Sequence, residues 1–171
     1  MEVVTGPDDI REQAIVLLVE QYQTSLRRIC YVILRDTDQA QDAVQETFLK
    51  AYQSWDRFRN ECDAKTWLMR IAINTCRDYH RSAWFRHMDR RITPEALPPA
   101  VVPIEEPHVE LTLAIMRLPL HLKEVTILHY YQDMTTREIA DTLHIAQSTV
   151  STRLKRARAK LRTLLERGES L

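Results

Sequence analysis

Glycine is nearly absent from this chain: only Gly6 and Gly168 occur among its 171 residues. Hairpins and β-sandwiches depend on glycine at tight turns that need positive φ angles. The chain is instead rich in Leu, Ala, Arg, Glu and Gln, most of which are good helix formers. Its hydrophobic fraction of 44% is typical of a globular protein. We therefore expect an all-α fold, with enough chain for one ordinary domain or two small ones.

Apolar residues spaced three or four apart predict the helices of the first part of the chain. A long helix is expected over about 10–34, and a second one, capped by Thr37 or Asp38, to about Trp55. Residues 56–65 are polar and predict a loop, after which a third helix is expected. The buried face of the second helix is predicted to be Val44, Phe48, Ala51 and Trp55, and that of the third Leu68, Ile71, Thr75 and Tyr79, with Trp67 nearby.

Five of the seven prolines lie within residues 93–107. Proline at that density cannot continue a helix, and the composition changes there from basic to acidic. We predict a Pro-rich linker over 93–108 that joins two small helical domains, 1–92 and 109–171. A short helix over 109–117 and another that starts at Leu118-Pro119 open the second domain, since proline suits a first helical turn.

Residues 135–162 predict a helix-turn-helix. Thr135 and Glu138 form a capping box, in which each side chain satisfies a backbone N–H at a helix start. Ile145 and Val150 can close a small core against that first helix. The second helix is strongly basic and contains no acid over residues 153–162; its cations are Arg153, Lys155, Arg156, Arg158, Lys160 and Arg162.

Charge is unevenly distributed, although the formal net charge is zero. Residues 61–92 and 134–171 carry net charges of +3 and +4, while residues 1–60 and 93–133 carry −3 and −4. The zero sum therefore hides two separate positive surfaces, which is a pattern expected of a nucleic-acid-binding protein.

Nothing in the sequence indicates catalytic chemistry. The three cysteines have no paired spacing and are expected to be reduced thiols, and the six histidines lack metal-binding spacing. We expect no metal, no cofactor and no enzyme. The N-terminus lacks an apolar signal core, and no apolar run approaches the ~20 residues of a membrane span, so a soluble cytoplasmic protein is predicted.

One face of the third predicted helix carries residues suited to a DNA strand. Arg70, Asn74, Arg77 and Arg81 step by four, three and four, so three guanidiniums and one amide share a side. Such a stripe is a plausible track for a phosphate backbone, and Asn74 could hydrogen-bond a base edge. Phe58, in the polar loop, is a candidate for stacking. By composition alone, Asp42, Gln45 and Glu46 on the second helix read as a solvated face.

Residues 15–162 together resemble an extracytoplasmic-function (ECF) sigma factor, the two-domain promoter-recognition subunit of bacterial RNA polymerase. The segment DTDQAQDAVQETFLKAY, residues 36–52, is similar to the family's grip on the clamp helices of the largest polymerase subunit. WLMRIAINTCRDYHR, residues 67–81, resembles the helix that captures the non-template strand of the −10 element. The resemblance implies polymerase binding by Asp42, Gln45, Glu46 and Phe48, and −10 binding by Phe58, Arg70, Asn74, Arg77 and Arg81, with Asn74 reading a flipped base.

Residues 118–158 resemble the family's reader of the −35 element. The resemblance implies that Ser151, Thr152, Lys155 and Arg156 face bases or nearby phosphates in the major groove. Thr149 belongs to the same DNA-binding set, and Arg153 and Arg158 are implied to contact the backbone or to pack. The chain departs from the family pattern at four positions, which are His144 for Gly, Ala146 for Ser, Lys123 for Arg and Ser151 for a basic residue.

The resemblance implies that this protein directs core RNA polymerase to promoters by reading both elements and helping to open the DNA. Its implied partners are the β′ clamp helices and β flap of the polymerase, promoter DNA, and an anti-sigma factor of a class that is often membrane-anchored. The alternative is a stand-alone helix-turn-helix repressor or activator, which would leave the Asp42, Gln45, Glu46 surface and the Asn74 stripe without a role. An enzyme that uses cysteine or histidine is the third possibility.

Overall fold

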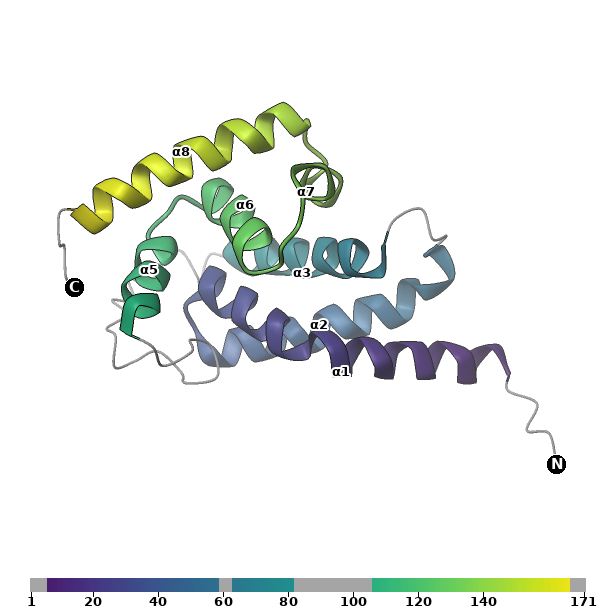
Figure 1. Ribbon diagram of the computed structural model, residues 1–171. Coiled ribbons are helices and arrows are strands. Elements are labelled where there is room, and N and C mark those ends of the chain that lie inside the picture. The colour runs from purple at the N-terminus through teal and green to yellow at the C-terminus, as the bar shows by residue number, and fades with distance from the viewer. Residues whose placement is uncertain (1–5, 59–62, 82–105, 167–171) are drawn as a thin grey trace.

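The computed structural model describes residues 6–58, 63–81 and 106–166. Within these ranges the chain forms seven α-helices and one short 3-10 turn, with no strand (Figure 1), which confirms the all-α fold class. Most of the predicted linker, residues 93–105, and Cys62 lie outside the described residues. We call α1 to α3 the N-terminal unit and α5 to α8 the C-terminal unit.

The N-terminal unit begins with α1 (Pro7–Leu34), which starts three residues earlier than the apolar spacing predicted. Pro7 occupies the first helical position, where its missing N–H costs nothing. The carboxylate of Asp9 accepts a hydrogen bond of 2.9 Å from the backbone N–H of Gly6. Helix α1 ends at Leu34, and its C-cap residue, Arg35, adopts the left-handed conformation with φ 57°.

The cap of α2 (Thr37–Ser54) is Asp36, so the predicted cap at Thr37 or Asp38 is wrong. Asp36 has an extended backbone, and its carboxylate accepts a hydrogen bond of 2.9 Å from the N–H of Gln39. The turn at Arg35 takes only one residue, which leaves Asp36 as the first residue able to cap. Thr37 and Asp38 therefore lie in the first turn of the helix.

Helix α3 (Ala64–Arg81) follows the 3-10 turn η1 (Trp55–Arg57) and begins two residues before the predicted end of the loop. Of its predicted inward stripe, Leu68 and Thr75 are buried, whereas Ile71 and Tyr79 are only partly buried. Five further residues of α3 are buried, namely Thr66, Met69, Ala72, Ile73 and Cys76. The stripe was drawn too narrowly because α3 is covered on two sides, by α1 and α2 and by α7.

The C-terminal unit consists of α5 (Glu106–Met116), α6 (Leu120–Tyr130), α7 (Thr136–Leu143) and α8 (Gln147–Glu166). Helix α5 begins inside the predicted linker, because Pro107 lies in its first turn, where proline is tolerated. Pro119 is the N-cap of α6 rather than a residue of its first turn. The helix-turn-helix is present as α7 and α8.

The two units pack against each other through α3. Figure 1 shows α6 and α7 on one side of α3 and α1 and α2 on the other, with α8 on the outer side of the C-terminal unit. Helices α5 and α6 also contact α1. This arrangement, called the closed arrangement below, decides which candidate DNA-binding residues reach solvent.

Candidate nucleic-acid interface

Phe58 belongs to an aromatic cluster with Trp55 and Trp67 at the junction of α2, η1 and α3. Its ring stacks on Trp67 with centroids 4.7 Å apart and planes at 29°, and lies 5.7 Å from Trp55. Trp55 and Trp67 meet edge to face at 6.0 Å. Phe58 remains partly exposed. The cluster fixes Phe58, which follows η1, next to the start of α3. The same helix α3 carries the candidate base reader Asn74.

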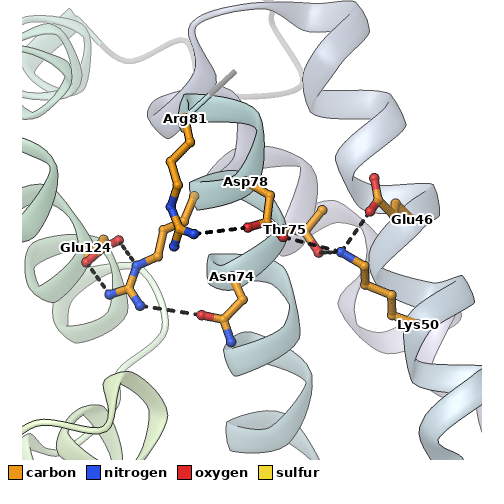
Figure 2. Close-up of polar contacts among 8 residues, drawn as sticks. Glu46, Lys50, Asn74, Thr75, Asp78, Arg81 and Glu124 are labelled. Atoms are coloured by element: carbon orange, nitrogen blue, oxygen red, sulfur yellow. Dashed lines mark hydrogen bonds and ion pairs between the residues drawn. The ribbon is translucent and has the colours of Figure 1, made fainter. Parts of the chain in front are cut away.

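The predicted DNA residues of α3, called the α3 stripe, are Arg70, Asn74, Arg77 and Arg81. Asn74 is exposed, and its Oδ1 accepts a hydrogen bond of 3.4 Å from Nη1 of Arg77. Arg81 is also exposed and lies 3.8 Å from Asp78. Figure 2 shows Asn74 and Arg81 on α3, with Glu124 on one side and Glu46 and Lys50 on the other.

Two guanidiniums of the α3 stripe are held by the C-terminal unit. Arg77 donates from Nε at 2.6 Å and from Nη2 at 2.8 Å to the two carboxylate oxygens of Glu124 on α6. Arg70 donates from Nη2 to the backbone carbonyl of Asp141 on α7 at 2.9 Å. The hydrogen bond that Arg77 donates to Glu124 raises the pKa of Arg77, even though burial acts in the opposite direction.

The phosphate track expected along α3 stays a prediction, and in the closed arrangement two of its guanidiniums are occupied. The residues share a helix as predicted, but Arg70 and Arg77 already have acceptors. Sequence reasoning missed Glu124 as the partner of Arg77 because it treated the two units separately. An available signal was the charged pair Lys123-Glu124, which lies between the apolar residues Leu122 and Val125 of α6.

Helix α8 keeps its candidate DNA face in solvent. Its buried stripe consists of Val150, Leu154, Ala157 and Leu161. The predicted reading residues, by contrast, are all exposed; they are Ser151, Thr152, Lys155 and Arg156. The two hydroxyls donate to carbonyls one turn back, Ser151 at 3.2 Å and Thr152 at 3.0 Å.

Two of the other three predicted −35 residues, Thr149 and Arg153, are partly buried. Arg158 is exposed; it donates from Nε to the carbonyl of Leu154 at 3.3 Å and lines a groove formed mainly by α5, α6 and α8. Whether Arg158 contacts the DNA backbone or packs stays a prediction.

The capping box that predicted the helix-turn-helix is confirmed. Oγ1 of Thr135 accepts from the N–H of Glu138 at 3.2 Å, and the carboxylate of Glu138 accepts from the N–H of Thr135 at 2.7 Å. Hydrogen bonds from the side chain and backbone of Thr135 lower the pKa of Glu138. The start of α7 is thus well secured.

The turn into α8 uses residues that are unusual for its geometry. His144 adopts the left-handed conformation, with φ 53° and ψ 48°, where glycine is usual. The N–H of Ile145 donates to the carbonyl of Ala140 at 3.1 Å, which closes a Schellman-type turn. Ala146 precedes α8 without a side-chain acceptor, but Gln147 donates from Nε2 to Oγ1 of Thr136 at 2.8 Å. The two helices are therefore linked at their N-termini.

A second candidate surface lies on α2. Asp42 and Gln45 are exposed, and Glu46 forms an ion pair of 2.7 Å with Lys50. Phe48 is buried, so its side chain supports this surface from the core. Leu49 is 54% exposed and was missed, although positions 42, 45, 46 and 49 follow the helical spacing that places them on one face.

Metal-ligating side chains do not gather in the described part of the chain. Across residues 6–58, 63–81 and 106–166 there is no group of three His, Cys, Asp or Glu side chains that could hold a metal ion. In the same ranges, no helix is both long and apolar enough to cross a membrane.

Comparisons with known proteins match both units. The family described as Sigma-70 region 2 matches residues 18–86, and Sigma-70, region 4 matches residues 108–161. The RNA polymerase sigma-H factor of Pseudomonas aeruginosa is 30% identical over 169 residues, covering 91% of this chain and 88% of that protein. The ECF RNA polymerase sigma factor SigW of Bacillus subtilis is also 30% identical, covering 90% of each chain.

Two solved structures share the fold. One is CnrH in complex with the cytosolic domain of CnrY, with a TM-score of 0.72 at 26% identity over 92% of this chain and 91% of that one. The other is the sigma factor RpoE of Bartonella quintana in complex with the anti-sigma factor NepR, with a TM-score of 0.71 at 24% identity, covering 91% and 96%. The two matched regions follow one another along the chain, and the two sigma-factor relatives align over about 90% of both chains. The chain belongs to the ECF family of RNA polymerase sigma factors and is an alternative sigma factor that directs RNA polymerase to promoters.

Proposed function

We propose that the two units divide promoter recognition, with α8 reading the −35 element and α3 the −10 element. The observation that carries this division is the exposed face of α8, opposite its buried stripe. Lys155 and Arg156 lie on that face next to two hydroxyl side chains. In the major groove each good bidentate contact to a base gives ~1 to 3 kcal/mol of discrimination.

The proposed −10 site combines Asn74 with the aromatic cluster. A base taken out of the stack costs a few kcal/mol, which contacts in a pocket must offset. The amide of Asn74 can pair with a base edge, and Phe58 offers a partly exposed ring face for stacking. Arg70, Arg77 and Arg81 would then hold the strand through its phosphates.

Core polymerase would dock on the face formed by Asp42, Gln45, Glu46 and Leu49, called the docking face. Its mixture of acidic and apolar side chains suits a basic, amphipathic coiled coil such as the clamp helices. Glu46 and Asp42 lie near Tyr79 of α3. Burial of the Tyr79 hydroxyl, together with these two carboxylates, raises the pKa of Tyr79. The β flap is the second polymerase contact that we propose, on the C-terminal unit.

An anti-sigma factor is a further proposed partner. A groove of about 720 Å³ is formed by α5, α6 and α8 of the C-terminal unit, with Arg28 as its one lining residue from α1, and its lining is mainly apolar but includes Glu166. Arg28, Arg158 and Arg162 lie along it. Charge complementarity favours an amphipathic helix with acidic side chains as its occupant. The solved RpoE complex with an anti-sigma factor supports this kind of partner; membrane anchoring of that partner and a cytoplasmic location of this chain stay predictions.

In vitro transcription tests the division of labour. Core polymerase is incubated with the protein on a library in which both promoter elements are randomised, and the transcribed templates are sequenced. We expect two enriched elements separated by a fixed spacing. Enrichment of an upstream element alone, together with failure to bind core polymerase, would instead favour the stand-alone regulator.

A further inference from the structure

Several hydrogen bonds between the two units share one chemical direction. Basic side chains of the N-terminal unit donate to acceptors of the C-terminal unit at four points among the described residues. The donors are Arg35, Lys65, Arg70 and Arg77, and the acceptors are the carbonyls of Met116, Gln132 and Asp141 and the carboxylate of Glu124. Two of the four donors belong to the α3 stripe.

Glu124 holds Arg77 in the way that a phosphate would. Two N–H groups of one guanidinium donate to two carboxylate oxygens, at 2.6 and 2.8 Å. The guanidinium fork matches carboxylate and phosphate with the same geometry. Because Glu124 is only 2% exposed, its bond to Arg77 is shielded from water. Arg77 therefore cannot bind a DNA strand and Glu124 at the same time.

The two DNA-reading helices differ in accessibility. Helix α7 packs on α3 (Figure 1), and its backbone accepts a hydrogen bond from Arg70. The reading residues of α8, by contrast, are exposed. The closed arrangement thus occupies two cations of the −10 reader, Arg70 and Arg77, although Asn74 is exposed, and it leaves the −35 reading residues exposed.

We propose that the C-terminal unit is an autoinhibitory cover of α3, with Glu124 as its latch on Arg77. The −10 strand binds only after α6 and α7 leave α3, which links strand capture to the docking of polymerase. This inference rests on the role proposed above for α3.

The latch can be opened at moderate cost. A buried ion pair adds little net stability, because the desolvation of both groups offsets their attraction. Lys123, next to Glu124, is buried, and its positive charge lies near that of Arg35. On the α3 side, His80 and Arg77 face this part of α6. Separation of the units returns these groups to water. A partner that binds only the separated units then shifts the population by its differential affinity.

The test compares three variants of the full chain without polymerase. Glu124→Gln keeps the shape of the latch but leaves Arg77 without its counter-charge. Lys65→Met removes a different contact between the units and serves if Glu124→Gln does not fold. Glu110→Gln removes the same charge from an exposed site on α5 and is the control. Small-angle X-ray scattering reports separation of the units, and fluorescence anisotropy with a labelled 20-nucleotide random single strand reports access to α3.

Glu124→Gln should enlarge the radius of gyration and bind the single strand about tenfold more tightly, within the usual range of coupling between sites. Lys65→Met should shift both readouts in the same direction by less, and Glu110→Gln should match the wild type. Wild-type scattering and wild-type strand affinity in both latch variants would overturn the latch, as would separation of the units without tighter strand binding. Failure of the wild type to bind core polymerase would instead contradict the proposed function and leave the latch measurement intact.

Discussion

Lys123 and Glu124 are neighbours on α6 and are both buried, at 4% and 2% exposure. The carboxylate of Glu124 is paired with the guanidinium of Arg77, whereas the ammonium group of Lys123 lies near the like charge of Arg35. Burial, with a smaller contribution from Arg35, lowers the pKa of Lys123 from 10.5 to about 7. The interface between the units thus contains an ammonium group that loses its proton near neutral pH. Its charge is costly in the closed arrangement and harmless in the unfolded chain.

Replacement of Lys123 by Met should therefore stabilise the protein in a pH-dependent way. Unfolded lysine keeps its pKa near 10.5, so between about pH 7 and pH 10.5 the unfolded state binds the extra proton, and wild-type stability rises with pH. Below about pH 7 both states are protonated, and the penalty is largest. Lys123→Met removes this contribution, so its advantage in urea unfolding should shrink by up to ~1.4 kcal/mol per pH unit above pH 7. Parallel curves for the two proteins would contradict this, and exposed Lys160→Met is the control.

Loss of the Asn74 amide should impair promoter opening more than polymerase binding. The side chain is exposed on α3 and is proposed to contact a flipped base, whereas the docking face belongs to α2. Permanganate reactivity of the melted region should fall for Asn74→Ala, while a pull-down with core polymerase remains near the wild-type level. Equal loss in both assays would refute the assignment; Gln21→Ala, an exposed amide on α1, is the matched control.

Charge reversal at Glu46 should weaken binding to core polymerase. Glu46 pairs with Lys50 at 2.7 Å, so a lysine at position 46 also repels its helical neighbour and cancels the net negative charge of the docking face. We expect lower affinity for core polymerase in a competition assay against the wild type. Glu110→Lys tests a reversal on the other unit, and unchanged affinity of Glu46→Lys would remove this residue from the docking face.

Removal of Arg156 separates base reading from phosphate contact. If the guanidinium contacts a base, Arg156→Ala should lose ~1 to 3 kcal/mol of discrimination at one position of the −35 element. If it contacts only phosphate, binding should weaken evenly over all sequences, and the salt dependence should fall by about one charge. A binding series over single-base variants of the selected element distinguishes these outcomes, with exposed Lys160→Ala as the control on the same helix.

A serine in place of Ala146 should stabilise the helix-turn-helix. Ala146 occupies the cap position of α8, where its side chain offers no hydrogen-bond acceptor. The N–H of Thr149 donates instead to the backbone carbonyl of Ala146 at 2.9 Å. A serine hydroxyl at this position should add ~0.5 to 2 kcal/mol to the free energy of unfolding. Urea unfolding measures the gain. Ala159→Ser, exposed in the interior of α8, should bring none, and an equal gain there would contradict the capping explanation.

Much of the fold follows from local rules that the sequence displays. The scarcity of glycine predicted the all-α class, and the Thr135–Glu138 pair located the start of α7 because both halves of a capping box lie within four residues. The caps at Asp36 and Pro119 were misplaced by one or two residues, since several neighbouring residues can each satisfy a free N–H. The family assignment also replaces the alternative of a stand-alone regulator.

The contact between the units could not be predicted in the same way. Arg77 and Glu124 are separated by 47 positions along the chain, and no periodicity within either helix relates them. Each residue alone is typical of a solvated surface or, for Arg77, of a phosphate contact. Only the packing of α6 and α7 against the N-terminal unit brings the two charges together and reveals that one surface covers the other.

The aromatic cluster gives this protein a built-in optical reporter. Two of its three tryptophans, Trp55 and Trp67, lie 6.0 Å apart, and Phe58 contacts both. A nucleobase that stacks on Phe58 would change the polarity and the quenching around both indoles. Intrinsic emission can therefore follow strand capture in an unlabelled protein, in real time.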